Sequence, residues 1–308
     1  MAMAIDGLLG WPNGLYARIG HPVTWLGRLI AALDRHWNSD DDLPWKQRIA
    51  GAAAAFTVIA MAGALALLVQ AAIGSGWARL LLLGILAWPF IALRSLHEHV
   101  AAVALPLQAR DVTGARQAVS MIVGRDPSKL DDAGIARAAI ESLAENASDG
   151  VVAPVFWGVM FGLPGIVGYK AVNTLDSMIG HRTARHEAFG WAAARIDDIA
   201  NFVPARLTGM LLALVSMRPS ESLGCMARDA RQHRSINGGW PEAAMAGALR
   251  VRLCGPRVYH GIVANEPWMN ESAGDPTAGD VVLALKLYTR AMILVAGLLV
   301  VLSFGRPS

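Results

Sequence analysis

A row of acids is the first group of residues whose types and spacing could support chemistry. Glu141, Glu145 and Asp149 are spaced four apart, and no lysine or arginine stands at the partner positions four residues further on. Spacing of four places side chains on one helical face, where like charges repel one another. The row also runs directly into an apolar segment. We therefore expect it to hold a cation, either a metal ion or a substrate amine.

A second polar group follows that apolar segment. Lys170, Asn173 and Asp176 lie three residues apart, and His181 comes soon after them. Such a face is the inverse of the apolar stripe with which a helix normally packs into a core. Ionisable groups beside membrane segments are costly unless they pair or line a cavity. The group therefore predicts either a salt bridge between neighbouring segments or a substrate site.

A third group contains two adjacent acids and a nearby amide. Asp197 and Asp198 precede Asn201, and Arg195 and Arg206 stand on either side. Magnesium prefers hard oxygen ligands, usually one or two carboxylates together with phosphates and water. Adjacent acids are common on exposed helices, so the flanking arginines and the apolar sequence that follows make the signal stronger than the pair alone.

Two predicted turns carry the remaining candidates. Arg125 lies in a turn that leads into a helix; a helix cap is the simpler interpretation, and phosphate binding near the helix start is the functional one. Asn237 and Glu242 belong to a polar stretch that ends in a turn. Glu242 follows a proline there, as is typical of the first turn of a helix.

The composition indicates that these residues belong to a membrane protein. Hydrophobic residues, at 54%, and the 31 glycines together make about 64% of the 308 residues, against about 45–50% for soluble domains. Mean hydropathy is +0.40, which argues against disorder. The net charge of +3 is too small to indicate a nucleic-acid-binding surface. Cys225 and Cys254 fit no metal or redox spacing, so we expect both to be inert small hydrophobes.

Runs without formal charge predict the membrane segments. The longest forms a helix of about 45 Å, which exceeds the roughly 30 Å core of a bilayer. Proline and glycine interrupt the third run, so we favour a broken or re-entrant hairpin there, which would bring its two polar flanks together. A turn is expected between the first two runs. The runs are residues 49–78, 80–93, 150–169, 207–217 and 291–305.

These patterns predict an all-α fold: a polytopic integral membrane helical protein with about four to five membrane segments, one of them broken or re-entrant, plus polar helical loops. We expect residues 1–308 to form a single membrane-embedded helical domain, multi-pass in the cell (inner) membrane. Strand signals are negligible. The site-forming polar segments are residues 97–149, 170–206 and 218–290.

A series of short motifs follows in order along the chain: Gly20-His21-Pro22-Val23, Gly27-Arg28-Leu29-Ile30, Gly124-Arg125-Asp126-Pro127, Glu141-Ser142-Leu143-Ala144-Glu145-Asn146, Ser148-Asp149-Gly150, Tyr169-Lys170-Ala171, Asn173-Thr174-Leu175-Asp176-Ser177-Met178, Asp197-Asp198-Ile199-Ala200-Asn201 and Gly239-Trp240-Pro241-Glu242-Ala243-Ala244-Met245-Ala246-Gly247. In this order they resemble the membrane-bound adenosylcobinamide-phosphate synthase family of cobalamin biosynthesis. The resemblance covers most of the chain, roughly from Asp6 to Asp280. One departure is Gly10-Trp11-Pro12, where many members look like Gly-Asp-Pro.

The resemblance implies an ATP-dependent amide ligation on a corrin ring. The propionate carboxyl of adenosylcobyric acid would join (R)-1-amino-2-propanol or its phosphate, giving adenosylcobinamide or its phosphate. A carboxylate is a poor electrophile, so such ligases commonly pass through an acyl phosphate, which needs Mg²⁺ and positive charge around the phosphates of ATP. The implied partners are the corrinoid, the amino-alcohol phosphate, the lipid membrane and either other cobalamin-pathway enzymes or a second copy of the chain, with no nucleic acid.

On this resemblance the candidate residues receive three expected roles. The catalytic residues are Glu141, Glu145, Asp149, Lys170, Asn173 and Asp176. The residues that bind substrate or phosphate are Arg125, His181, Arg195, Asn201, Arg206, Asn237 and Glu242, and the metal ligands are Asp197 and Asp198.

Two other classes of protein compete with the enzyme. A transporter or channel would also place ionisable residues beside broken helices, and it predicts vectorial flux without an amide product. A non-catalytic membrane sensor of related helical fold predicts that substitutions in the acid clusters leave partner binding intact.

Overall fold

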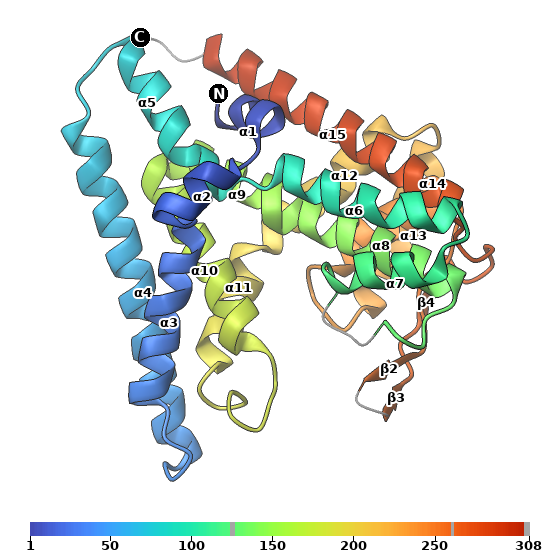
Figure 1. Cartoon of the computed structure of the whole chain (residues 1–308), viewed down its shortest axis with the longest axis horizontal. Helices are drawn as coiled ribbons and strands as arrows, with labels where there is room; N and C mark the ends of the chain where they lie inside the picture. The colour runs from blue at the N-terminus through green and yellow to red at the C-terminus, as the bar shows by residue number, and fades with distance from the viewer. Residues whose placement is uncertain (124–126, 260–261, 305–308) are drawn as a thin grey trace. The chain divides into compact units, whose positions relative to one another are not determined.

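The computed structural model describes residues 1–123, 127–259 and 262–304, and helices dominate this part of the chain (Figure 1). The chain divides into two compact units, each assembled from segments far apart in sequence. Unit 1 comprises Met1–Ala92 and Asp149–Phe202, and unit 2 comprises Leu93–Ser148 and Val203–Ser308. That residues 1–308 act as one membrane-embedded domain stays a prediction.

Unit 1 is entirely helical in the described residues. The π-helical turn η2 begins at Ser148, the last residue before the second segment of this unit. The elements are α1 (Ala2–Leu9), α2 (Asn13–Ile19), α3 (Pro22–Trp37), α4 (Pro44–Ala72), α5 (Trp77–Ala87), the 3₁₀ turn η1 (Trp88–Phe90), η2 (Ser148–Val152), α9 (Ala153–Phe161), α10 (Leu163–Leu175), the π-helical turn η3 (Asp176–Gly180) and α11 (Trp191–Ala200).

Unit 2 combines helices with two short antiparallel strand pairs, β1 with β4 and β2 with β3. The strands are the small exception to the expected helical chain. The elements are α6 (Leu93–Gln108), α7 (Val112–Ser120), α8 (Asp132–Ala147), α12 (Phe202–Val215), α13 (Pro219–Asp229), the 3₁₀ turn η4 (Ala230–Gln232), α14 (Gly239–Leu249), β1 (Leu253–Cys254), β2 (Arg257–Tyr259), β3 (Ile262–Ala264), β4 (Trp268–Met269) and α15 (Ala278–Phe304).

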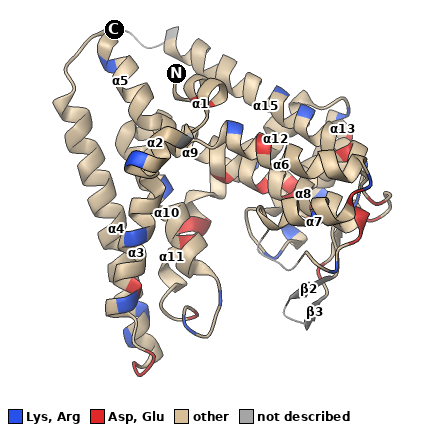
Figure 2. Ribbon diagram, viewed as in Figure 1, with Lys and Arg blue, Asp and Glu red and all other residues tan. Residues whose placement is uncertain are grey.

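The apolar helices confirm the all-α membrane fold. Within the described ranges, three stretches are long and apolar enough to cross a bilayer, or four if the pair Trp191–Ala200 and Phe202–Val215, bent by 45°, counts as one broken span. Figure 2 shows α4 without charges along most of its length. The three stretches are Pro44–Ala72, Trp77–Gln108 and Ala278–Ser303.

The break expected within residues 150–169 lies at Gly162, between α9 and α10, which pack against each other. That this segment enters a membrane stays a prediction, because the bent pair among the candidate spans lies at Trp191–Ala200 and Phe202–Val215. Gly162 separates the two helices with φ 69°, in the left-handed region that favours glycine. A Cβ on Gly165 would lie 2.1 Å from the Trp157 carbonyl oxygen, so only glycine permits this approach. Gln70 of α4 accepts a hydrogen bond from the Leu163 amide at 2.7 Å and thereby caps the start of α10.

Small side chains allow the helices of unit 1 to pack closely, as is common in membranes. Figure 1 shows α3, α4, α10 and α11 side by side, and they are in contact. Their buried core contains Ala54, Ala55 and Ala171 beside larger residues such as Ile30 and Leu175. This packing fixes α10 and α11, which carry the polar residues that follow the hairpin.

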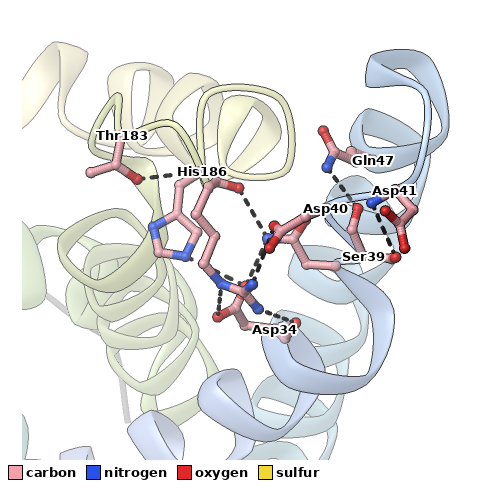
Figure 3. Close-up of polar contacts among 9 residues, drawn as sticks. Asp34, Ser39, Asp40, Asp41, Gln47, Thr183 and His186 are labelled. Carbon is pink, nitrogen blue, oxygen red and sulfur yellow. Dashed lines mark hydrogen bonds and ion pairs between the residues drawn. The ribbon is translucent and has the colours of Figure 1, made fainter.

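A polar network ties the loop after α3 to the segment between η3 and α11 (Figure 3). Arg185 donates to the Asp34 carboxylate at 3.2 Å, and Asn38 donates to the same carboxylate at 2.9 Å. The Asn38 amide also donates to the Arg185 carbonyl at 3.1 Å. His186 Nε2 lies 3.4 Å from Asp34. These contacts hold the segment that leads into α11 against the end of α3.

Helix α14 is the centre of unit 2. Its buried residues include Glu242 and the run Ala243–Met245, and it packs against α8 and α13. Gly247 lets α13 approach, because a Cβ there would lie 2.6 Å from the Glu221 carbonyl oxygen. An acid on so buried a helix needs polar partners, since burying an unpaired charge is costly.

Candidate functional site

The first candidate cluster lies in unit 1 around a lysine on α10. Lys170 donates to the Asn173 side-chain oxygen at 3.1 Å. Burial lowers the pKa of Lys170, while the carboxylates of Asp149 and Asp197 act in the opposite direction. The lysine therefore lies within electrostatic reach of two acids that sequence analysis had assigned to separate groups. We call Asp149, Tyr169, Lys170, Asp197 and Asn201 the lysine cluster.

Hydrogen bonds orient the acids of the lysine cluster. The buried Tyr169 hydroxyl lies 2.8 Å from Asn201 Oδ1 and 3.3 Å from the Asp149 carbonyl oxygen, and it can donate to either. The Asn201 amide donates to Asp197 Oδ2 at 3.0 Å. The Tyr169–Asn201–Asp197 chain fixes one oxygen of Asp197. Sequence analysis assigned no role to Tyr169, although its motif was part of the resemblance.

The second acid of the adjacent pair faces other neighbours. Asp198 accepts a hydrogen bond from Arg195 at 2.8 Å. Burial raises the pKa of Asp176, with His181 lowering it and Asp198 raising it further. The four residues Asp176, His181, Arg195 and Asp198 thus lie beside the lysine cluster, and Asp176 also acts electrostatically on Tyr169 of that cluster. Asp197 bonds to Asn201, and Asp198 bonds to Arg195.

Two acids of unit 1 lie in π-helical turns, which are rare and frequent at functional sites. Asp149 belongs to η2 and Asp176 to η3. Gly180 closes η3 against Asp176, because a Cβ at this position would lie 2.0 Å from a carboxylate oxygen. The sequence gives no signal for such turns beyond their glycines, Gly150 within η2 and Gly180 at the end of η3.

The second candidate cluster lies in unit 2 around buried Glu242. The Cys254 thiol donates to Glu242 Oε2 at 3.1 Å, and His233 Nε2 lies 3.8 Å from Glu242 Oε1. The Cys254 amide donates to Glu141 Oε1 at 2.6 Å. We call Glu141, His233, Glu242 and Cys254 the cysteine cluster. Cys254 is buried, as expected, but its thiol donates to a carboxylate instead of packing only against apolar groups. That it is inert stays a prediction.

The predicted row of three acids is divided between the two units. Glu141 is buried in the cysteine cluster, whereas Asp149 belongs to the lysine cluster. Glu145 is exposed but close to the cysteine cluster. A Cβ on Gly238 would lie 3.5 Å from Glu145 Oε1, 3.6 Å from Glu242 Oε1 and 3.4 Å from His233 Cε1. Glu145 and the cysteine cluster thus approach the same point.

Arg206 and Asn237, predicted from distant segments, come together in unit 2. The Arg206 guanidinium donates to Asn237 Oδ1 at 2.9 Å and to the Ile236 carbonyl at 3.1 Å. It also stacks 4.6 Å from the ring centre of Trp240, in a cation–π arrangement. This arginine is held in a fixed orientation, as a phosphate-binding group requires.

Arg125, predicted to bind phosphate, lies outside the described residues. The helix that follows it, α8, begins at Asp132. The carboxylate of Asp131 caps this helix by accepting from the Gly134 amide at 2.8 Å. The helix start therefore already has a capping carboxylate.

The oxygen donors of the lysine cluster fit the expected magnesium. Asp149 and Asp197 offer carboxylates and Asn201 an amide, which are hard ligands. Magnesium needs only one or two carboxylates when phosphates supply the rest, so the separation of Asp197 from Asp198 is compatible with binding. The catalytic, substrate and metal roles named from the sequence remain predictions, as does their convergence in one pocket.

Known proteins that resemble this chain identify its family. A family model described as CobD/Cbib protein matches residues 1–288. The chain is 62% identical over 305 residues to the "Cobalamin biosynthesis protein CobD" of Rhodobacter capsulatus, covering 98% of this chain and 96% of that protein. Proteins of the same name from Brucella suis and Sinorhizobium fredii are 42% and 43% identical, covering 98% and 94% of this chain and 95% and 91% of theirs. No solved structure matches.

Proposed function

The chain belongs to the CobD/Cbib family, and from that premise we propose that this membrane protein of cobalamin biosynthesis is an adenosylcobinamide-phosphate synthase. It joins the propionate carboxyl of adenosylcobyric acid to (R)-1-amino-2-propanol phosphate, or to the free aminopropanol, and consumes ATP. The observation that carries the proposal is the lysine cluster, in which a partly buried amine lies within electrostatic reach of two acids.

The lysine cluster has the groups that amide formation from a carboxylate requires. Transfer of a phosphoryl group needs positive charge near the developing phosphate charge. Lys170 supplies that charge, and the Asp149 and Asp197 carboxylates favour its protonated form. The amine substrate must lose a proton as the amide bond forms, and a nearby carboxylate can accept it. Asp149 is the proposed acceptor, because Asp197 is the proposed ligand of magnesium.

Magnesium bound with ATP supplies charge neutralisation at the phosphates. Asp197 would hold it, with Asp198 as the second proposed ligand. The fixed hydrogen bond from Asn201 to one oxygen of Asp197 favours binding through the other oxygen. Arg195, already paired with Asp198, would neutralise the charge of the phosphates. Asn173, Asp176 and His181 would orient the substrate.

Unit 2, taken by itself, contains groups suited to binding an anion. Arg206, held by Asn237 and Trp240, is the proposed ligand for the phosphate of the amino alcohol. Glu145 is exposed and acidic, and is the proposed partner for the substrate amine. The row of acids that contains Glu145 predicts such a pairing between a carboxylate and the charged amine of the substrate.

Mass spectrometry of corrinoids tests the proposal. The purified full chain is incubated with adenosylcobyric acid, Mg-ATP and each candidate amine in turn: aminopropanol phosphate, ethanolamine phosphate and free aminopropanol. We expect an ATP-dependent amide product with at least one of them. Asp197→Asn and Glu145→Gln should each lose most of the ligation, whereas Asp41→Asn, in an exposed loop, should retain it. Full ligation by either cluster variant would defeat its assignment.

The bent pair of helices favours transport as a second candidate function. Asp197 and Asp198 lie on the first arm of the pair Trp191–Ala200 and Phe202–Val215, and transporters use broken helices of this kind at their binding sites. Sealed vesicles containing the protein distinguish the two functions. Transport predicts corrinoid or ion flux without amide product, and the ligase predicts product without flux.

A further inference from the structure

We propose that His233, Glu242 and Cys254 of unit 2 bind a divalent transition-metal ion of the zinc class. Their ligand atoms, one imidazole nitrogen, one carboxylate oxygen and one sulfur, all lie within 4.8 Å of one another. In a tetrahedral zinc site, metal–ligand distances of about 2.0–2.3 Å separate neighbouring ligand atoms by about 3.4–3.6 Å. His233 Nε2 lies 3.8 Å from Glu242 Oε1, and the Cys254 sulfur lies 3.1 Å from the other carboxylate oxygen, Oε2. Metal binding therefore requires the three side chains to draw closer around one oxygen of Glu242.

The three ligands come from separate parts of unit 2 that its fold brings together. His233 follows η4, Glu242 lies on α14, and Cys254 ends β1. The His233 and Glu242 side chains are 6% and 4% exposed, and Cys254 is 2% exposed. A carboxylate buried to this degree needs a compensating positive charge or several hydrogen bonds. A metal ion shared with imidazole and thiolate supplies that charge.

The backbone at Cys254 is held in an unusual conformation. Its φ is 61°, in the left-handed region, which a residue other than glycine adopts only at a cost. Two contacts maintain it: the amide donates to Glu141 Oε1 at 2.6 Å, and β1 pairs with β4. Glu141 is thus a positioning residue, which aims the sulfur toward Glu242 without being a ligand itself.

The ring of His233 has a partner for either tautomer. Ser235 places both its amide nitrogen, at 3.1 Å, and its carbonyl oxygen, at 3.3 Å, near Nδ1. When Nδ1 carries the proton and donates to the carbonyl, Nε2 presents its lone pair toward Glu242. Metal-binding histidines usually have this arrangement, in which the other ring nitrogen donates to a backbone carbonyl or a carboxylate.

The mixed donor set determines the class of metal. Thiolate and imidazole select zinc and similar ions, whereas magnesium and calcium prefer all-oxygen sites. Three protein ligands also leave a fourth position for water or substrate, as in catalytic zinc sites. Glu145 approaches the point beside Gly238 where Glu242 and His233 also lie.

Cobalt spectroscopy of the full chain in detergent tests the site. Co²⁺ bound to a thiolate gives a sulfur-to-cobalt charge-transfer band in the near ultraviolet, and we expect this band at saturation with about one ion per chain. Zn²⁺ should displace the cobalt, and excess Mg²⁺ should not. Cys254→Ser should abolish the band and weaken cobalt binding about 100-fold. Cys225→Ser is the matched control, because that thiol is also buried and bonded to a carboxylate, at 3.3 Å from Asp229.

Several outcomes would overturn the site. One is the absence of a charge-transfer band in the wild-type chain, which needs no variant and so does not depend on whether a variant folds. Another is an equal loss of the band in Cys225→Ser and Cys254→Ser. His233→Gln should weaken the charge-transfer band without abolishing it, since the thiolate remains. An unchanged affinity for cobalt in this variant would exclude the imidazole as a ligand. Because the readout is metal binding, its failure is distinguishable from a failure of the proposed ligation.

Discussion

The lysine cluster and the cysteine cluster differ in the hardness of their donors. Unit 1 presents carboxylates, an amide and a phenol, which are oxygen donors, beside the positive charge of Lys170. Unit 2 presents a thiol, an imidazole and buried carboxylates. Hard oxygen ligands suit magnesium and phosphate chemistry, and softer ligands suit zinc-like ions. Two acid-rich regions of one chain therefore differ in the metal-ligand types that they offer, so the cations proposed for them differ as well.

The two clusters also differ in how the fold positions them. The lysine cluster follows a helical hairpin whose reversal and cap depend on Gly162 and Gln70 of α4. The cysteine cluster collects residues from loops and a short strand around the buried helix α14. The first is therefore sensitive to helix packing in unit 1. The second is sensitive to the conformation at Cys254.

The largest expected effect is that of Lys170→Ala on ligation. Removing the ammonium group leaves two nearby carboxylates without their shared positive partner and removes charge stabilisation at the phosphate. We expect ligation to fall at least about 100-fold, which corresponds to about 2.7 kcal/mol in the activation barrier. The measurement is the rate of corrinoid amide formation under saturating Mg-ATP.

The control for this variant is Lys46→Ala, which removes an exposed lysine at the start of α4. It should keep the wild-type rate. Lys170→Ala should also keep the cobalt band of unit 2, because none of the three proposed ligands lies in unit 1. Loss of both ligation and cobalt binding would mean that the two clusters are not independent, which would contradict their separate roles.

The next effect concerns the hairpin that precedes Lys170. Gly162→Ala places a Cβ 2.4 Å from Gln70 Oε1 at a residue with φ 69°, so it strains the backbone and displaces the cap of α10. We expect a loss of about 2–3 kcal/mol in the free energy of unfolding. Thermal unfolding in detergent measures it. Gly168→Ala, in the helix α10 that follows and with no atom within 4 Å of its added Cβ, should have little effect; equal destabilisation would contradict the hairpin geometry.

Much of the fold follows from local sequence. The charge-free run at residues 49–78 predicts α4, although the helix itself is Pro44–Ala72, and proline with glycine predicts the reversal at Gly162. The run at residues 291–305 underestimates α15, which begins at Ala278 and includes Asp280, Lys286 and Arg290. A rule based on charge-free runs misses these charged residues because a long helix can extend beyond an apolar segment or carry them on one face.

Less of the candidate site follows from local sequence. Spacing places Asp197 near Asn201, and the structure joins them by a hydrogen bond. Spacing cannot predict that His233 approaches Cys254, because a whole helix separates these residues in sequence and they meet only through tertiary packing. The row from Glu141 to Asp149 is regular in sequence, yet its members belong to different clusters. Periodicity identifies a face of a helix but not what packs against it.

A smaller effect distinguishes two arginines that stack on tryptophan in unit 2. Arg206 lies 4.6 Å from the ring centre of Trp240, and Arg252 lies 4.4 Å from that of Trp268. Arg206→Ala should lower ligation with the amino-alcohol phosphate about 10-fold, or about 1.4 kcal/mol, through a higher KM. Its effect with the free amino alcohol should be smaller.

The matched variant Arg252→Ala removes an arginine that pairs with Asp275 at 2.7 Å and has no proposed substrate role. We expect it to lower thermal stability slightly and to leave the KM unchanged. Steady-state kinetics with both amines separates the two cases. An equal rise in KM for both variants would show that loss of the arginine–tryptophan stacking, and not loss of phosphate binding, causes the rise.

The smallest effect is an acid-dependent loss of stability at the network of Figure 3. Burial alone raises the pKa of Asp34, but hydrogen bonds from Asn38 and Arg185 outweigh it and lower the pKa below its ordinary value. A carboxylate with a lowered folded-state pKa adds stability above its unfolded pKa of about 3.9, and that stability is lost as the pH falls through the folded value. Asp34→Asn should therefore cost about 1 kcal/mol or less at pH 7.

The difference between Asp34→Asn and the wild type should vanish at low pH, where Asp34 itself is protonated. Thermal unfolding from neutral pH to about pH 2.5 measures it, below the ordinary aspartate pKa of about 3.9. Asp41→Asn is the control, since this neighbouring acid is exposed and should show no such dependence. A difference that persists unchanged at the lowest pH would mean that the variant acts through packing. The charge on Asp34 would then have no part in holding the segment before α11, and thus none in positioning the lysine cluster.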